Sequence, residues 1–168
     1  DYALKIHHRG VRTNGKKIMS LLNDVIEKQE EKHKELEQVR TLFRNSLYDL
    51  EEHLQKEEQI LFPYLYRLFE ANRNNEEIEG IHCGEVMYPI NAMMEDHANE
   101  ELRYEKISNL TNSYKRSSKE DSDYNLLMQK LNSFEDNLHE HIYIENQIIF
   151  PNAITVERDM QEKGKVVE

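Results

Sequence analysis

The sequence contains few of the residues that interrupt helices or cross-link a chain. Its 168 residues include 5 glycines, 3 prolines and 1 cysteine, and tryptophan is absent. An all-β fold needs many tight turns, and so few glycines and prolines argue against it. The single thiol, Cys83, cannot form a disulfide within the chain, which predicts a reducing compartment and therefore a cytoplasmic location.

The sequence also lacks a hydrophobic run of the ~18 residues that a membrane-spanning helix requires. Its first residues do not follow the pattern of a secretory signal peptide. Charged residues make up 33% of the chain and the mean hydropathy is -0.88, which predicts a soluble protein. The chain begins at Asp1 rather than at methionine, so we expect a processed or truncated piece of a longer protein.

Positive charge is scarce as well. The chain has 22 lysines and arginines against 33 aspartates and glutamates, for a formal net charge of -11. Nucleic-acid binding relies on lysine and arginine contacts with phosphates, so a nucleic-acid partner is not expected. Binding to an anionic membrane surface is disfavoured for the same reason.

The sequence is rich in helix-forming residues, with apolar positions spaced three and four apart. This periodicity predicts four helices, at residues 2–28, 33–71, 89–114 and 124–150. They indicate an all-α fold, an antiparallel up-down four-helix bundle, in residues 1–156. A charged tail at residues 157–168 is expected to fray.

Two prolines fall inside or at the end of the predicted helices. Pro63 should kink the second helix or end it at about Phe62, and Pro151 should do the same to the fourth. Residues 72–84 are polar and read as the connection between the two halves of the chain.

Six polar residues fall on the apolar stripes of these helices, where a bundle core requires apolar side chains. A lone buried carboxylate costs several kcal/mol unless it is paired or binds a metal. The six residues would therefore need a shared partner, such as a metal centre, to offset the free-energy cost of burying them. The six are His8, His53, Glu57, His97, His141 and Glu145.

A repeated word carries four of these residues. Residues 53–63 read HLQKEEQILFP and residues 141–151 read HIYIENQIIFP, with identical residues at six of eleven positions. The single histidines repeat as well, since His8 precedes His53 by 45 residues and His97 precedes His141 by 44. The chain thus consists of two helix pairs, which predicts a pseudo-twofold arrangement with the ligands meeting in the middle.

The His-x-x-x-Glu spacing suits a metal site. Residues four apart on a helix differ by about 40° around the axis and about 6 Å along it, so both side chains can reach one metal pair. Imidazole nitrogens and carboxylate oxygens favour iron or manganese, with zinc as a further option. Ferritin-like bundles use Glu-x-x-His words instead, and these are missing from the core positions here.

The sequence resembles the hemerythrin-like proteins and, more narrowly, the C-terminal domain of the repair-of-iron-centres di-iron proteins. The words at 53–63 and 141–151 look like the two His-x-x-x-Glu motifs of that family. MEDH at 94–97 is similar to its third-helix motif, and KIHHRGV at 5–11 is similar to its first-helix motif. The resemblance covers nearly the whole chain.

The resemblance implies two iron ions, oxo- or hydroxo-bridged, in a non-haem di-iron centre. It implies four nitrogen ligands (His8, His53, His97 and His141) and two bridging carboxylates (Glu57 and Glu145). It also implies a role in repairing iron–sulfur clusters after damage by nitric oxide or oxidants, by supplying iron. The partners would be oxygen or nitric oxide and the damaged iron–sulfur proteins. Relatives usually carry a short N-terminal domain with a reactive cysteine, which this sequence lacks.

Two other functions fit the same site. The first is a carrier or sensor of oxygen or nitric oxide, as in true hemerythrins. Those proteins have a fifth histidine on one iron, and the stripes show no fifth core-facing histidine here. The second is an enzyme, a di-iron peroxidase or nitric oxide reductase. The sequence leaves open the client proteins, the metal loaded in the cell and the oligomeric state, a dimer included.

The other histidines and acidic residues that could bind a metal are expected to have structural or surface roles instead. His7 points about 100° away from the stripe that His8 continues. Glu101, one turn after His97, is expected to be exposed or in a salt bridge. His33 is expected to form a surface pair with Glu37. We also expect three further residues to lie outside the metal site: His82, Cys83 and His139.

Overall fold

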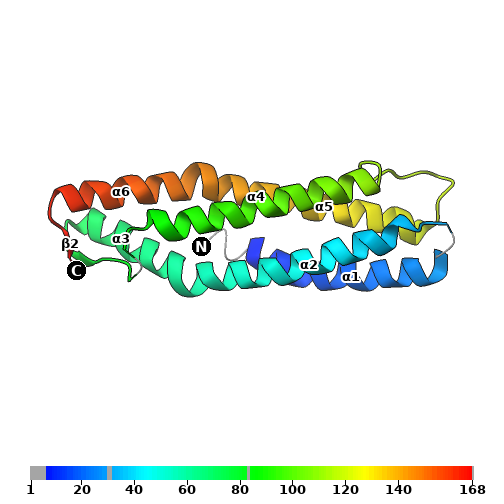
Figure 1. The fold of residues 1–168 in the computed structure, drawn as a ribbon, viewed down its shortest axis with the longest axis horizontal. Helices are drawn as coiled ribbons and strands as arrows, with labels where there is room; N and C mark the ends of the chain where they lie inside the picture. Colours follow the sequence, from blue (N-terminus) through cyan, green and yellow to red (C-terminus); the bar gives the residue numbers. More distant parts are fainter. Residues whose placement is uncertain (1–6, 30–31, 83, 168) are drawn as a thin grey trace. The chain divides into compact units, whose positions relative to one another are not determined.

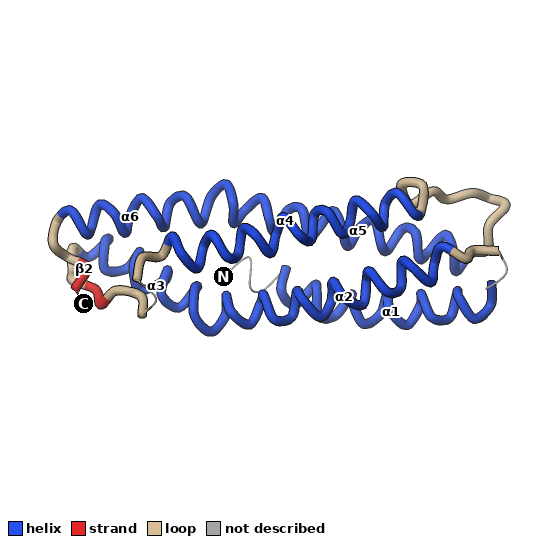
Figure 2. Tube along the Cα trace, in the orientation of Figure 1, coloured by secondary structure: helices blue, strands red, loops and turns tan. Residues whose placement is uncertain are grey.

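A computed structural model describes residues 7–29, 32–82 and 84–167. These residues form helices joined by short connections, with one small two-stranded sheet (Figure 2). The elements in chain order are α1 (Arg9–Gln29), α2 (Glu35–Lys56), η2 (Glu57–Leu61), α3 (Phe62–Asn74), β1 (Ile78–Glu79), α4 (Met87–Leu110), α5 (Ser122–Ile144), η3 (Glu145–Ile149), α6 (Phe150–Glu162) and β2 (Val166–Val167) (Figure 1).

The two π-helical segments, η2 and η3, each join two α-helices without a break. The described residues therefore contain four long helical segments, namely α1, α2 to α3, α4, and α5 to α6. This confirms the predicted all-α four-helix fold class. In the part of the chain that the structure describes, every helix is too short or too polar to span a membrane.

The chain divides into two compact units. The first comprises Asp1–Glu52 and Ala98–His141, and the second comprises His53–His97 and Ile142–Glu168. In the first unit, the connection at 111–121 reverses the chain between α4 and α5. Its core includes the rings of Phe43 and Phe134, whose centroids lie 5.2 Å apart in a T-shaped arrangement.

The first unit also contains a close approach between α1 and α2. A Cβ atom at the buried Gly15 would lie 2.5 Å from Cδ2 of Leu47, so the glycine makes room for that leucine against the α1 backbone. The buried Ser46 donates a hydrogen bond of 2.7 Å to Glu100, which ties α2 to α4 within the same unit.

In the second unit, α3 packs against α6, and both contact the sheet. Strands β1 and β2 are parallel, with Ile78 opposite Val166 and Glu79 opposite Val167. Apolar side chains from α3, α4 and α6 fill the core between them. This core includes Leu61, Leu65, Leu68, Ile78, Ile81, Val86, Ile90, Met93, Phe150, Ala153 and Met160.

The prolines do not end the helices. Helical structure continues past Pro63 to Asn74 and past Pro151 to Glu162. Each proline is the second residue of its α-helix, directly after a π-helical turn. Proline has no N–H and its ring crowds the carbonyl four residues earlier. A π turn pairs residues five apart, so the irregularity that the sequence predicts falls before each proline.

The C-terminal tail also differs from the prediction of a frayed segment from residue 157. Helix α6 continues to Glu162 and β2 follows it. Glu157 is buried, and it accepts hydrogen bonds from the Tyr64 hydroxyl at 2.6 Å and from the Val86 backbone N–H at 2.9 Å. These bonds and the sheet hold the segment against the second unit, although its composition is charged.

Candidate metal centre

Four of the six predicted ligands come together in the second unit. His53 lies in the last turn of α2, Glu57 opens η2, His97 lies on α4 and Glu145 opens η3. All four side chains are buried, with relative exposures of 0 to 3%. Each offers one nitrogen or oxygen atom, and these atoms lie within 4.8 Å of one another.

The closest atoms of this cluster are the ring nitrogens and carboxylate oxygens that metals bind. Nε2 of His53 lies 3.4 Å from Oε1 of Glu57, and Nε2 of His97 lies 3.2 Å from Oε2 of Glu145. The two Nε2 atoms are 3.1 Å apart. Two imidazoles and two carboxylates thus direct their donor atoms toward one small region.

The repeated word explains how the backbone presents the carboxylates. In both copies, the glutamate of His-x-x-x-Glu is the first residue of a π-helical turn, and Phe-Pro opens the next α-helix. Insertions of this type inside α-helices are frequent at functional sites. The identical residues of the two words therefore encode a local backbone shape as well as the ligands.

Two further residues face the outer nitrogens of the histidine rings. Nδ1 of His53 lies 3.3 Å from Oδ2 of Asp96, and Nδ1 of His97 lies 2.9 Å from Oδ1 of Asn146. An ionised carboxylate only accepts hydrogen bonds, and so does an amide oxygen. The protons therefore belong on Nδ1, which directs the Nε2 lone pairs toward the cluster, as metal-binding histidines require.

Sequence reasoning missed both of these oxygen donors. Asp96 directly precedes His97 in the MEDH motif, and Asn146 directly follows Glu145 in the repeated word. Their position beside ligands was the available signal. Their contacts depend on the packing of α2, α4 and η3 within the second unit, which spacing along one helix does not reveal.

The electrostatics of the cluster favour a cation. Burial alone would lower the pKa of His53. The hydrogen bond and negative charge of Glu57 outweigh burial, together with Asp96 and Glu145, so the pKa is raised. The same carboxylates that attract a proton to this ring would attract a metal ion. Two carboxylates and two imidazoles form a nitrogen and oxygen donor set that suits iron, manganese or zinc.

The other two predicted ligands lie in the first unit. The rings of His8 and His141 are buried and stacked, with centroids 5.3 Å apart. His141 stands on a continuous helical segment one turn before Glu145. The six predicted ligands are therefore all buried.

His7 contradicts the expectation that it points away from the core. It is only 3% exposed, and its ring meets that of His141 edge-on at 5.6 Å. The expectation assumed α-helical spacing, whereas His7 and His8 lie in π-helical backbone just before α1. Both neighbouring histidines are buried there.

On α4, the buried face includes Ile90, His97 and Tyr104. Met93 and Glu100 are buried, whereas Met94 and Glu101 are exposed. The prediction that Glu101 is an exposed residue is therefore confirmed. Glu100, which the sequence reasoning passed over, accepts hydrogen bonds from Ser46 and from Arg103.

The other histidines lie apart from the cluster. His33 contacts Glu35 and Glu120 and stacks on Tyr124 at 4.0 Å, rather than forming the predicted pair with Glu37. His139 is exposed, as predicted, and lies 3.9 Å from Glu135. His82 is also exposed. Cys83 lies outside the described residues.

Comparison with known proteins extends these observations. The family profile described as "Hemerythrin HHE cation binding domain" matches residues 2–153. The chain is 24% identical over 150 residues to the iron-sulfur cluster repair protein ScdA of Staphylococcus haemolyticus, which covers 89% of this chain and 64% of that protein.

Two further relatives are both called iron-sulfur cluster repair protein YtfE. The one from Dickeya chrysanthemi is 31% identical over 106 residues, covering 63% of this chain and 42% of that protein. The one from Escherichia coli O81 is 29% identical over 109 residues, covering 65% and 44%. The chain thus spans less than two thirds of the length of each of these three relatives.

Proposed function

Because the chain belongs to the hemerythrin HHE cation binding family, we propose that it holds two iron ions and repairs damaged iron–sulfur clusters by supplying iron. The observation that carries the proposal is the buried cluster of His53, Glu57, His97 and Glu145, with its donor atoms within 4.8 Å. The names of the curated relatives support the repair role. Since those proteins are longer, their activity is carried over to this chain only as part of the proposal.

The proposed ligands are the six residues that the repeat and stripes indicate. His8, His53, His97 and His141 would supply imidazole nitrogens, and Glu57 and Glu145 would bridge. The support is their burial together with the acceptors that face Nδ1 of His53 and His97. Iron bound by these donors would supply redox-active metal.

Residues of the chain would make the site ready to bind metal through ring orientation, negative charge and burial. Asp96 and Asn146 hold the His53 and His97 rings in the orientation that directs Nε2 inward. Glu57 and Glu145 offset half of the charge of two ferrous ions. Burial excludes bulk water, which strengthens the attraction between these carboxylates and a cation. Damage by nitric oxide or oxidants is the stress that we propose the protein answers.

An iron-transfer experiment tests this function. The iron-loaded chain is mixed with an iron–sulfur protein whose clusters have been damaged by nitric oxide, with sulfide and a thiol reductant supplied and a chelator present to capture free iron. We expect the recipient to regain its cluster absorption while the chain loses iron. His53→Ala should abolish the transfer, and His139→Ala, which changes an exposed histidine on α5, should leave it unchanged.

A chain that keeps its iron while the recipient stays damaged would contradict the repair function and leave metal binding intact. A second candidate, a reversible carrier of oxygen or nitric oxide, is favoured by one observation, the burial of His7 beside His141. This supplies the fifth core histidine that the sequence stripes did not show. Anaerobic reduction followed by oxygen titration separates the two, since a reversible adduct supports the carrier and irreversible oxidation with iron loss supports repair.

A further inference from the structure

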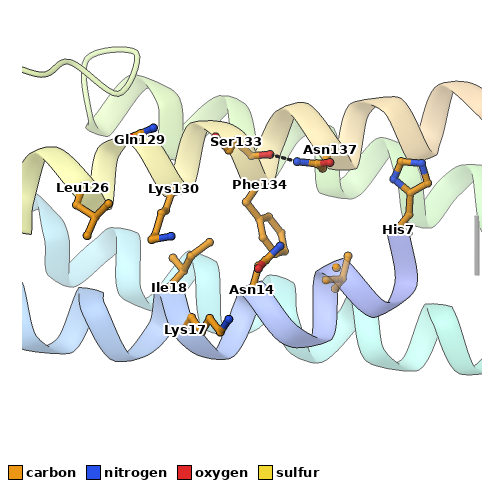
Figure 3. Close-up of a pocket in the computed structure, with 12 residues that line it drawn as sticks. His7, Asn14, Lys17, Ile18, Leu126, Gln129, Lys130, Ser133, Phe134 and Asn137 are labelled. Atoms are coloured by element: carbon orange, nitrogen blue, oxygen red, sulfur yellow. Dashed lines mark hydrogen bonds between the residues drawn. The ribbon is translucent and has the colours of Figure 1, made fainter. Parts of the chain in front are cut away.

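A cleft of about 380 Å³ lies between α1 and α5 in the first unit (Figure 3). Six residues from each side line it, and its walls combine polar and apolar side chains. The lining residues are His7, Gly10, Val11, Asn14, Lys17, Ile18, Leu126, Gln129, Lys130, Ser133, Phe134 and Asn137.

The charge of this lining is opposite to that of the chain. The chain has 33 aspartates and glutamates among its 168 residues, yet the twelve lining residues include none. They include two lysines, Lys17 on α1 and Lys130 on α5, one from each wall. Figure 3 shows the Lys130 side chain pointing from α5 toward α1. The cleft is therefore a local positive region on an acidic protein.

The two lysines are not committed to carboxylates of the described residues. Lys28 and Lys32, farther along the chain, pair with Asp123 and Glu120. No aspartate or glutamate in the described ranges forms such a pair with Lys17 or Lys130. Their ammonium groups can therefore serve a bound anion.

The rest of the lining supplies neutral donors and an apolar floor. The side chains of Asn14 and Gln129 line the cleft, and their amide N–H groups can donate hydrogen bonds to carboxylate or phosphate oxygens. Ile18 and Phe134 are buried beneath the polar rim. Polar groups around an apolar floor, in a volume of this size, are typical of sites for small ligands.

We propose that the cleft between α1 and α5 binds a small oxyanion, a dicarboxylate or a phosphate, between Lys17 and Lys130. A protein with a net charge of -11 repels anions overall. Anion binding would therefore require a local arrangement such as this one. The buried His7 forms one end of the cleft, so the bound anion would lie beside the ring that packs against His141. The proposal concerns residues outside the six metal ligands and does not depend on iron.

Calorimetric titration of the purified chain with succinate and, separately, inorganic phosphate tests the site. Ionic strength is held constant with chloride, and the metal content is measured before and after. We expect saturable binding of at least one anion. The anion that binds more tightly shows whether the site prefers a carboxylate or a phosphate. Lys17→Gln and Lys130→Gln should each weaken binding about tenfold, because each removes a charged hydrogen-bond donor.

Lys106→Gln is the matched control, since Lys106 is an exposed lysine on α4 that does not line the cleft. Its affinity for the anion should equal that of the unaltered chain. No saturable binding would overturn the proposal. Equal affinity for the anion in all three variants would also overturn it. So would a titration in which heat is released only when the protein loses metal.

Discussion

At the scale of single residues, the metal site depends on the orientation of the histidine rings as well as on which residues are the ligands. The sequence indicated His53 and His97, and the structure adds Asp96 and Asn146 as oxygen acceptors facing their Nδ1 atoms. These contacts set which nitrogen carries the proton and therefore which one can bind a metal. Residues next to ligands in sequence can thus act on a ligand of another helix.

Asp96→Ala should weaken iron binding about tenfold, at the lower end of the effect of such acceptors, because Asp96 is partly exposed. Asp96→Asn should lose less, since its amide oxygen can still accept the proton from Nδ1 of His53. Iron titration monitored by absorbance measures both affinities. Asp136→Ala changes an exposed aspartate on α5 and should bind iron normally. Equal affinity in Asp96→Ala and Asp136→Ala would refute the orienting role.

Single-residue predictions from periodicity were confirmed at some positions and wrong at others. His139 and Glu101 are exposed, as expected. His7 is buried in π-helical backbone, and the sequence offered no sign of that local geometry. On α4, Met93 is buried and its neighbour Met94 is exposed, and two adjacent methionines fit either phase of the helical period.

At the scale of elements, the repeated word encodes a ligand pair and a π-helical turn together. The prolines of the word were read as helix breaks, yet each helix continues beyond its proline. The sequence therefore predicted the number and order of the long helices well. It predicted their ends less well, because tertiary contacts decide where a charged segment stops being helical.

Glu157 shows how such a contact secures the end of α6. Glu157→Leu should remove the acceptor for the Tyr64 hydroxyl and the Val86 N–H, leaving both donors buried. We expect a loss of about 1–3 kcal/mol of unfolding free energy for each donor left without an acceptor. Urea unfolding followed by circular dichroism measures the change. Glu162→Leu, at an exposed position of α6, should cost far less, and equal losses would contradict this role.

At the scale of the whole molecule, composition and the internal repeat were sufficient for the fold class and the family. They could not reveal how each compact unit is packed, because the contacts in a unit join segments far apart in the chain. The cleft between α1 and α5 and the β1–β2 sheet are examples, since neither leaves a pattern within one segment of sequence.

Metal removal should destabilise the protein as a whole. Without a cation, Glu57 and Glu145 remain buried near each other, and the binding energy of the metal is lost from the folded state. Chelation should lower Tm by roughly 5–10 °C if the metal is present at about 100 times its Kd. Differential scanning calorimetry with and without chelator measures this. Glu145→Ala should show a low Tm that chelation hardly changes, and a large chelator effect in that variant would argue for a different site.

The most direct test of the central claim is an anaerobic titration of the metal-free chain with ferrous iron, with bound metal counted by elemental analysis. The account predicts saturation at two iron ions per chain, and a substantial loss of bound iron in His53→Ala and in Glu145→Ala. Saturation at one ion or none, or full iron retention in both variants, would contradict the claim that these buried histidines and glutamates form a di-iron centre.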